Sequence, residues 1–267
     1  MLSLARLALL LAILTTGLMT GATQAQNMMG LDVTSDAFTK SMMTRAELEA
    51  ALAKLPAGEV LDLTGKSLNG LDLSGMDLRR TKLQAARLND ANLANTNLEG
   101  VVLDQAWALK SNFTGANLKH SSLFATQFGG GKLDGADFTG AHVAADFTNA
   151  SATKAKFDGA DLSADEKNQS MGLMRGAFKG AKLDGASFKG ANMQRVFMEF
   201  ASLRGADLSG ANLRKGEFAA ADLTDANVAG ANFDGADLNS ARIGKMKGED
   251  QAQNLDKAKN RERAIVN

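Results

Sequence analysis

A large apolar side chain returns at every fifth residue over most of this chain, and this spacing limits the possible folds more than any other feature. The series starts at Leu63 and runs through Leu68 and Leu73 to Val143, and only Ala108 breaks it. A period of five fits neither the amphipathic helix nor the half-buried strand. Glycine or a small polar residue, the types that turns favour, often follows each apolar centre. The pattern predicts an all-β solenoid of short strands and turns.

Each unit of five residues offers two inward positions. Side chains alternate along an extended segment, so the apolar centre and the residue two places before it lie on the same side. That earlier residue is usually alanine, as in Ala91-Asn92-Leu93. Large side chains at both positions would overfill a narrow core. The sequence therefore predicts a thin, filled core and an outer surface formed by the remaining positions.

The spacing slips once in the middle of the chain. Phe147 comes four residues after Val143, and the regular positions resume at Leu173 and continue to Ile243. We count 36 centres in the whole series. On the unshifted spacing the intervening positions would be polar, so we expect the shifted residues Phe147, Ala152, Phe157 and Leu162 to be buried. Residues 165–172 depart from the pattern, which predicts a protruding loop or a half-turn. Such a loop either takes part in binding or is a tolerated surface insertion.

The first residues resemble a secretory signal. Arg6 supplies a positive charge, an apolar run extends from Leu7 to Leu14, and Ala25 ends a small-x-small pattern typical of a cleavage site. We expect cleavage after residue 25 and a mature chain that is periplasmic or secreted, with no stable membrane span. An uncleaved anchor is the alternative, although Thr15 interrupts the run well short of the ~20 residues that a span needs.

Two segments flank the repeats. Residues 26–57 contain a capping-box pattern at Thr44 and Glu47, which predicts a short helix over residues 45–55. We expect this helix to shield the open end of the solenoid, and a partner-binding helix is the alternative. Residues 246–267 lose the five-residue spacing and are expected to form a weak C-terminal helix over the last coil or to fray.

The side chains needed for common catalytic and metal sites are scarce. The sequence has no cysteine, and its two histidines, His120 and His142, both fall at outward positions away from any ligand or nucleophile spacing. The glycines follow the turn pattern and do not form a phosphate loop. We therefore expect no catalytic residue, no cofactor-binding residue, no metal ligand and no cofactor. An enzyme with an unrecognised surface site remains an alternative.

The repeated units resemble the pentapeptide repeat family. The resemblance rests on units such as Ala136-Asp137-Phe138-Thr139-Gly140 and Ala206-Asp207-Leu208-Ser209-Gly210. It implies a right-handed, four-sided parallel β-helix of about nine coils over residues 58–245, with a phase-shifted coil at 144–164. The spacing alone does not decide whether each coil has three or four sides. At the usual ~4.8 Å between strands, nine coils would extend about 43 Å.

Some members of this family inhibit DNA gyrase by mimicking DNA, and this is one alternative for the function. Mimicry needs a continuous negative surface. Residues 58–143 instead carry 9 acidic and 8 basic side chains, and residues 173–245 carry 8 acidic and 10 basic ones. The charge balance therefore argues against DNA mimicry. With an enzyme also disfavoured, we expect a non-enzymatic exported scaffold for protein–protein interaction, of unknown specific role, that does not bind nucleic acid.

Large apolar residues at outward positions are the candidate contacts of such a scaffold. Clustered exposed aromatic residues often anchor interfaces. We expect an unknown protein partner, or a second copy of the chain, to bind there. Coverage of these residues by another segment of the chain is the alternative. The predicted interaction surface consists of Val102, Trp107, Leu109, Phe124, Phe197 and Phe200.

Overall fold

The computed structural model describes residues 36–164 and 174–266. The chain divides into two units, residues 1–40 and 41–267. In the first unit, the described part contains helix α2 (Asp36–Thr39), where the Lys40 ammonium lies 3.1 Å from the Asp36 carboxylate. The predicted signal at residues 1–25, the predicted loop at 165–172 and the predicted centre Leu173 lie outside the described residues.

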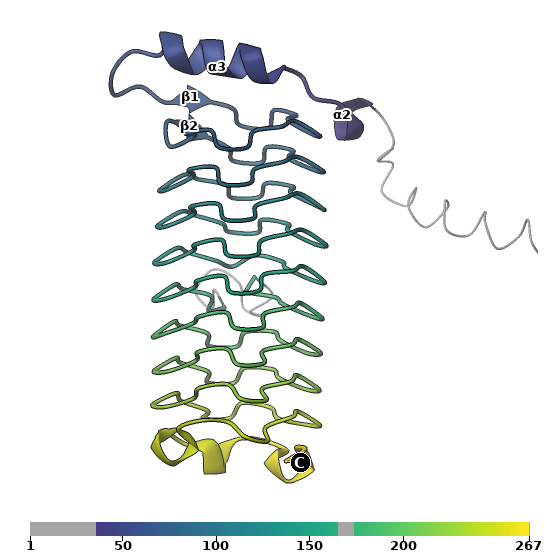
Figure 1. Cartoon of the computed structure of the whole chain (residues 1–267), viewed down its shortest axis with the longest axis vertical. Helices are drawn as coiled ribbons and strands as arrows, with labels where there is room; N and C mark the ends of the chain where they lie inside the picture. The colour runs from purple at the N-terminus through teal and green to yellow at the C-terminus, as the bar shows by residue number, and fades with distance from the viewer. Residues whose placement is uncertain (1–35, 165–173, 267) are drawn as a thin grey trace, which may run out of the picture. The chain divides into compact units, whose positions relative to one another are not determined.

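The second unit is a parallel solenoid in which each coil returns after about 20 residues (Figure 1). Strands β1 (Leu61–Asp62) and β2 (Thr81–Lys82) form its first parallel pair. Isolated parallel bridges continue from there and form four ladders, one on each side of the coil. We name them face A, with Lys82, Val102, Ser122 and His142; face B, with Arg87, Trp107, Gln127 and Asp146; face C, with Asn92, Asn112, Lys132 and Ser151; and face D, with Asn97, Asn117, Asp137 and Lys156.

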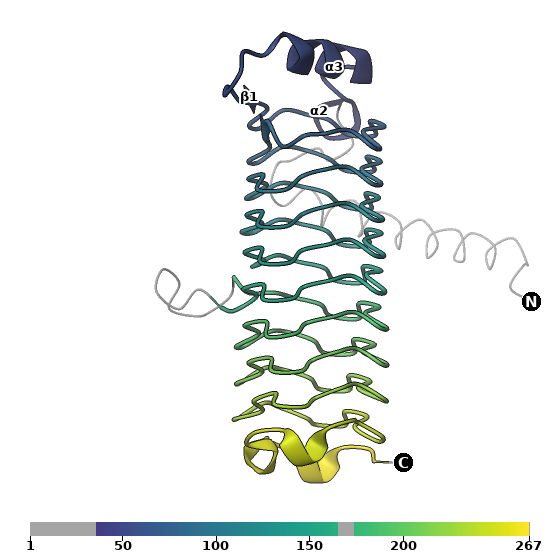
Figure 2. The ribbon, with the colours of Figure 1, turned by 60° about the vertical axis from the view of Figure 1, so that its left-hand side comes forward.

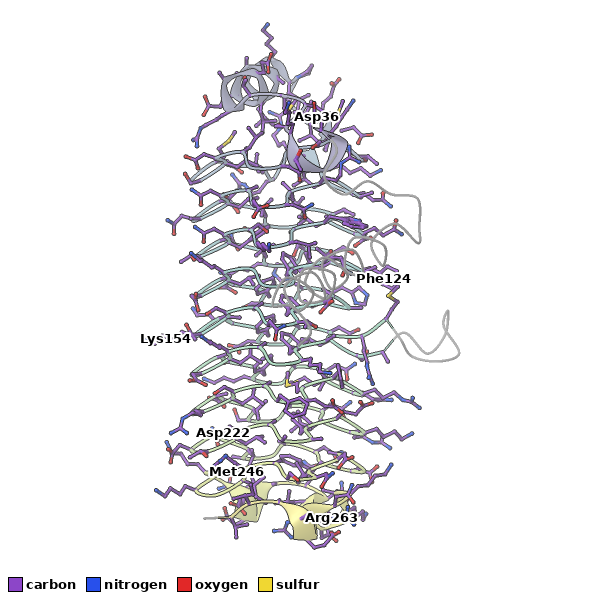
Figure 3. The ribbon with its side chains drawn as sticks, turned by 90° about the vertical axis from the view of Figure 1, so that its right-hand side faces the viewer. Asp36, Phe124, Lys154, Asp222, Met246 and Arg263 are labelled. Atoms are coloured by element: carbon purple, nitrogen blue, oxygen red, sulfur yellow. The ribbon has the colours of Figure 1, made fainter. Side chains whose placement is uncertain are left out.

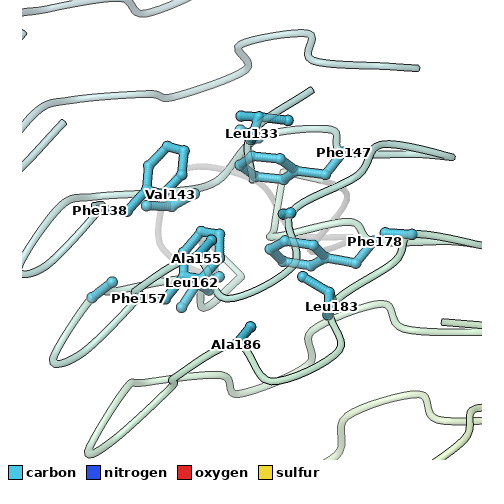
Figure 4. Packing of buried hydrophobic residues seen from close by; sticks show 14 of the residues in the cluster. Leu133, Phe138, Val143, Phe147, Ala155, Phe157, Leu162, Phe178, Leu183 and Ala186 are labelled. Atoms are coloured by element: carbon cyan, nitrogen blue, oxygen red, sulfur yellow. The ribbon is translucent and has the colours of Figure 1, made fainter. Parts of the chain in front are cut away.

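The apolar centres fill the inside of the coil. Every centre from Leu63 to Ile243 that the structure describes is buried, including Ala108, which occupies the same inward position as the larger centres. Phenylalanine rings stack between coils in two columns (Figure 4). The ring centroid of Phe147 lies 5.0 Å from that of Phe128 and 4.6 Å from that of Phe178. In the second column, the ring centroids of Phe138 and Phe157 lie 4.6 Å apart. The shifted residues predicted to be buried are buried.

The corners between faces are tight turns closed by the backbone. In a regular corner the carbonyl of the centre accepts from the amide three residues later, as Leu73 does from Met76 at 3.2 Å. The residue two places after the centre then takes a positive φ, such as 69° at Gly75 and 55° at Ala220. Glycine adopts this conformation without steric cost, whereas alanine does not. A glycine at this corner position therefore avoids the strain that alanine bears there.

Helix α3 (Arg45–Lys54) lies across the first coil (Figure 2). The predicted capping box is present, because the Thr44 hydroxyl accepts from the Glu47 amide and the Glu47 carboxylate accepts from the Thr44 amide. Leu48 is fully buried and belongs to the core of the solenoid. The Arg45 guanidinium donates to the carbonyl of Asp72 at 3.2 Å, which ties the helix to the first coil.

Two successive corners between faces A and B depart from the regular length. The first is one residue short, so that Gln127 pairs with Asp146, 19 positions further along the chain. In the next coil, Asp161 on face A is followed on face B by Ala177. The Gly176 amide donates to the Leu162 carbonyl at 2.9 Å and closes this long corner at its base. The ladder therefore resumes at Ala177 and Phe178, later than the predicted loop boundaries implied.

The C-terminal segment continues the four faces with a different repeat. Lys247, Gln253, Lys259 and Ile265 pair with the preceding coil at intervals of six residues. Three 3-10 helices, η2 (Glu249–Gln251), η3 (Leu255–Lys257) and η4 (Arg261–Arg263), lie between these positions. The segment therefore forms neither the single weak helix nor the frayed end that the sequence led us to expect, but three short 3-10 turns that continue the ladders. A positive φ at Asn254 or Asn260 turns the chain before each 3-10 helix, which favours a short turn over a continuous helix. Among the described residues, no helix combines the length and apolar character that a membrane span requires.

Candidate interaction surface

The predicted interaction residues gather on face B and beside it. Trp107 and Phe197 belong to the ladder of face B, where Gln127, Asp146 and Ala177 lie between them. Their outward direction follows from the repeat, because each precedes a buried centre, Ala108 and Met198 respectively. Trp107 is 40 % exposed and Phe197 is half-buried. Val102 lies on face A and is half-buried.

The other three predicted residues lie at the two corners that border face B. Leu109 and Phe200 follow face B in the chain and lie at its corner with face C. Phe200 is 61 % exposed, whereas Leu109 is half-buried. Phe124 precedes face B, at the corner with face A, and is half-buried. Figure 3 shows Phe124 and Lys154 at opposite edges of the solenoid. Of the six predicted residues, the structure therefore places five on face B and its borders, and Val102 on the neighbouring face A.

A hollow lies between Trp107 and Phe197 on face B. Alanines at positions 125, 144, 145 and 177 line much of it, together with Gln127, Asp146 and Phe197. The short corner contributes to this shape, since Ala144 and Ala145 are both buried there. The hollow has a volume of about 340 Å³. Face B therefore presents two aromatic side chains separated by a lower region.

Arg175 fixes the C-terminal border of this hollow. Its guanidinium donates to the Glu217 carboxylate at 2.8 Å and to the Arg195 carbonyl at 3.1 Å. It also lies over the Phe197 ring, 5.1 Å from the centroid. These contacts hold Phe197 in place on face B. Neither Arg175 nor Glu217 was predicted from the sequence. Arg175 lies in the long corner, where the five-residue spacing gives no position, and Glu217 occupies an ordinary outward position of the ladder.

A second hollow adjoins the first on the same side of the solenoid. It has a volume of about 510 Å³ and is more polar. Basic side chains outnumber acidic ones in its lining, which includes Arg175, Arg195, Lys215, Glu217, Asp237 and Lys259. The aromatic part of face B is therefore followed by a region of mixed, mainly positive charge.

The histidines lie apart from this surface. His142 belongs to face A, where its Nδ1 atom lies 3.7 Å from the Asp161 carboxylate. The contact with His142 and hydrogen bonds from Ser163 lower the pKa of Asp161 below its usual value. His120 lies at the corner between faces D and A. Within residues 36–164 and 174–266, no three His, Asp or Glu side chains are grouped closely enough to hold a metal ion. We find no arrangement typical of catalysis in this part of the chain.

The similarity to known structures is moderate. The chain is 24% identical to HetL, a pentapeptide repeat protein involved in heterocyst differentiation regulation from the cyanobacterium Nostoc sp. Strain PCC 7120, with 84% of this chain and 97% of HetL covered and a TM-score of 0.41. It is 20% identical to QnrB1, a plasmid-mediated fluoroquinolone resistance protein, with 68% of this chain and 76% of QnrB1 covered and a TM-score of 0.47. A comparison with curated proteins gives no match.

The repeats themselves give the stronger match. Eight copies of the family described as pentapeptide repeats match residues 62–95, 86–123, 110–140, 143–164, 177–210 and 201–239. Together these ranges span more than half of the chain. They coincide with the ladders and leave out the long corner between Leu162 and Ala177. The chain belongs to the pentapeptide repeat family, and its solenoid is the right-handed β-helix of that family.

Proposed function

We propose that this protein is a non-enzymatic, exported scaffold that binds another protein chain through face B. The exposed Trp107 is the observation that carries this proposal. A tryptophan at an outward position of a repeat whose other outward residues are mostly small or polar has a cost in solubility that binding would offset. Tryptophan is also enriched among the residues that dominate binding energy at interfaces.

Further support comes from the arrangement around Trp107. Phe197 on the same face, Phe124 and Leu109 at its borders, and the hollow between the two aromatic residues combine apolar area with shape. The polar border formed by Arg175 and Glu217 resembles the rim of a protein interface. The family is generally structural or interaction-mediating, which agrees with a scaffold.

The proposal includes three finer features of the chain. Residues 1–25 act as a cleaved signal, so that the mature protein works in the periplasm or outside the cell. The β-helix has about nine coils over residues 58–245. Helix α3 caps the first coil, because its buried Leu48 covers apolar side chains that would otherwise face water.

The charge pattern gives no support to DNA mimicry. Each of the four faces carries at least one basic side chain among its outward positions: Lys82 on face A, Arg87 on face B, Lys132 on face C and Lys156 on face D. Basic residues at these positions interrupt any negative column along the solenoid. A surface that replaces a DNA duplex needs closely spaced negative charge.

The test compares the wild-type protein with Trp107→Ser. The purified mature chain is immobilised and exposed both to extracts of the export compartment and to the same chain in solution. We expect a bound protein that is lost with Trp107→Ser and retained with Trp107→Phe, because phenylalanine keeps an aromatic anchor. The matched control is Lys156→Ser on face D, which should bind like the wild type. Equal binding by all four proteins would contradict the proposal.

A further inference from the structure

We propose that face B binds face B of a second copy, so that two chains associate antiparallel about a two-fold axis that crosses the face at Asp146. This inference rests on the proposed function and names the partner. The axis lies in the plane of the interface, perpendicular to the solenoid. It reverses the order of the coils and keeps each corner of face B against the same corner of the other copy. Such an interface is self-complementary by symmetry.

The ladder of face B reads as a complementary series around Asp146. Trp107 lies two bridges before Asp146, and Phe197 lies two bridges after it. The axis therefore places Trp107 of one copy against Phe197 of the second copy, and the reverse. Arg87 lies three bridges before Asp146, and Glu217 lies three bridges after it. Arg87 then meets Glu217 of the second copy, so opposite charges flank each aromatic pair.

The two corners repeat this complementarity. At the corner with face C, Leu109 and Lys110 lie at the level of Trp107, while Glu199 and Phe200 lie at the level of Phe197. Each side thus contributes one apolar residue and one charge, and the charges are opposite. At the corner with face A, Asp104 lies at the level that the axis relates to Arg195, and Phe124 lies at the level related to Arg175. An arginine over an aromatic ring is a favourable contact.

The matched region is long enough for a specific interface. Six bridge spacings separate Arg87 from Glu217. At ~4.8 Å for each spacing, the region extends about 29 Å along the solenoid. Each pair occurs twice because of the two-fold symmetry. A match of aromatic residues at one level and of opposite charges at the next, together with the pairs at both borders, favours a second copy over an unrelated chain.

One position opposes the association. Asp146 lies on the axis and meets its own copy, and like charges directly opposite are unfavourable. Arg175 lines the same hollow and supplies positive charge from each copy. The geometry therefore predicts that Asp146→Asn tightens the dimer. Asparagine keeps the oxygen that accepts from the Thr148 amide at 2.8 Å in the wild type, so the corner stays intact.

A charge exchange tests the register of the two copies. Lys110→Glu and Glu199→Lys each place like charges across the border, and we expect each to weaken the dimer on the order of tenfold. The double variant restores the opposite charges and should recover the wild-type dissociation constant. Sedimentation equilibrium across a dilution series measures these constants. Independent, additive weakening in the double variant would overturn the pairing.

Cross-linking tests the position of the axis in a chain that has no natural cysteine. Packed sheets stand about 10 Å apart, which is too far for a direct disulfide. A short bis-maleimide should therefore link Asp146→Cys to its own copy. Lys156→Cys on face D of the same coil is the matched control and should stay unlinked. Equal linking of both variants, or linking of the control alone, would overturn the proposed axis.

The mass of the wild-type protein separates failure of this inference from failure of the proposed function. We expect light scattering to give twice the mass of the mature chain for the wild type and one chain mass for Trp107→Ser. A monomeric wild type that captures a different protein in a Trp107-dependent way would overturn self-association and leave the scaffold function standing. A monomeric wild type without Trp107-dependent capture would overturn both.

Discussion

Trp107 and Phe197 lie on the same face of the solenoid, four β-bridges apart, although 90 residues separate them in the sequence. The short corner after Val143 and the long corner after Leu162 both lie between them. Because these changes fall at corners, they leave the four ladders continuous. The two aromatic residues therefore share one surface, on which Arg175 holds Phe197 and the hollow lies between them.

The inward position of Leu118 predicts a severe defect for Leu118→Asp. Leu118 is fully buried. A carboxylate at this position would lose its hydration and gain no partner in the apolar core, which is energetically costly. We expect a loss of more than about 4 kcal/mol in the free energy of unfolding, with loss of strand signal in circular dichroism. Ala94→Asp is the control, because it introduces the same side chain at a half-buried corner position, where the neighbouring coils have the uncharged Ser74 and Thr114. A variant Leu118→Asp with an unaltered melting temperature would show that this assignment of the inward face is wrong.

The corner conformation predicts opposite effects for two alanine–glycine exchanges. Ala220 has a φ of 55°, so Ala220→Gly removes a left-handed strain of roughly 1 kcal/mol and should raise the melting temperature. Gly75 has a φ of 69° and open space around its Cα, so Gly75→Ala should lower stability by about 1 kcal/mol through strain alone. Urea unfolding measures both variants. Shifts of the same sign would contradict the role given to the corner glycines.

The stacked rings predict that phenylalanines inside and outside the coil behave differently. Phe147 contacts Phe128 and Phe178 in the core, and we expect Phe147→Ala to cost about 3–5 kcal/mol in unfolding free energy. Phe200 is 61 % exposed, and Phe200→Ala should change this free energy by less than about 0.5 kcal/mol. Chemical unfolding of the two variants side by side gives the comparison. Similar losses in both would show that exposure does not govern their contribution.

The lowered pKa of Asp161 predicts a part of the acid sensitivity. A carboxyl group whose folded pKa lies below its unfolded value of ~3.9 stabilises the fold above that value. This contribution is lost as the pH falls through the folded pKa, so stability should decrease from about pH 5 downward. Asp161→Asn should flatten this decrease relative to the wild type. The measurement is the urea midpoint at each pH.

Asp225→Asn is the control for this measurement, because Asp225 projects from an exposed corner. We expect its profile to follow that of the wild type. If Asp161→Asn and Asp225→Asn gave the same profile, the contact of Asp161 with His142 and Ser163 would have no part in the acid response.

The inward residues of the repeats were predictable, and the exceptions show where prediction stopped. Burial of Leu118 or Phe157 follows from local alternation and the five-residue period, both of which are visible in the sequence. The capping box of Thr44 and Glu47 was equally local. The terminal 3-10 helices were not predicted. The residues that recur there at intervals of six are mostly polar, and the turns between them depend on pairing with the preceding coil.

The sequence alone determined that this chain winds around a thin apolar core, that the phase shift at Phe147 keeps apolar residues inside, and that Trp107 and Phe197 point outward. Each of these features depends on residues a few positions apart. Only the tertiary structure decided that Trp107 and Phe197 share face B and that Arg175 pairs with Glu217. The physical reason is that contacts between coils depend on the length of every intervening corner, and a corner that gains or loses residues changes which side chains become neighbours.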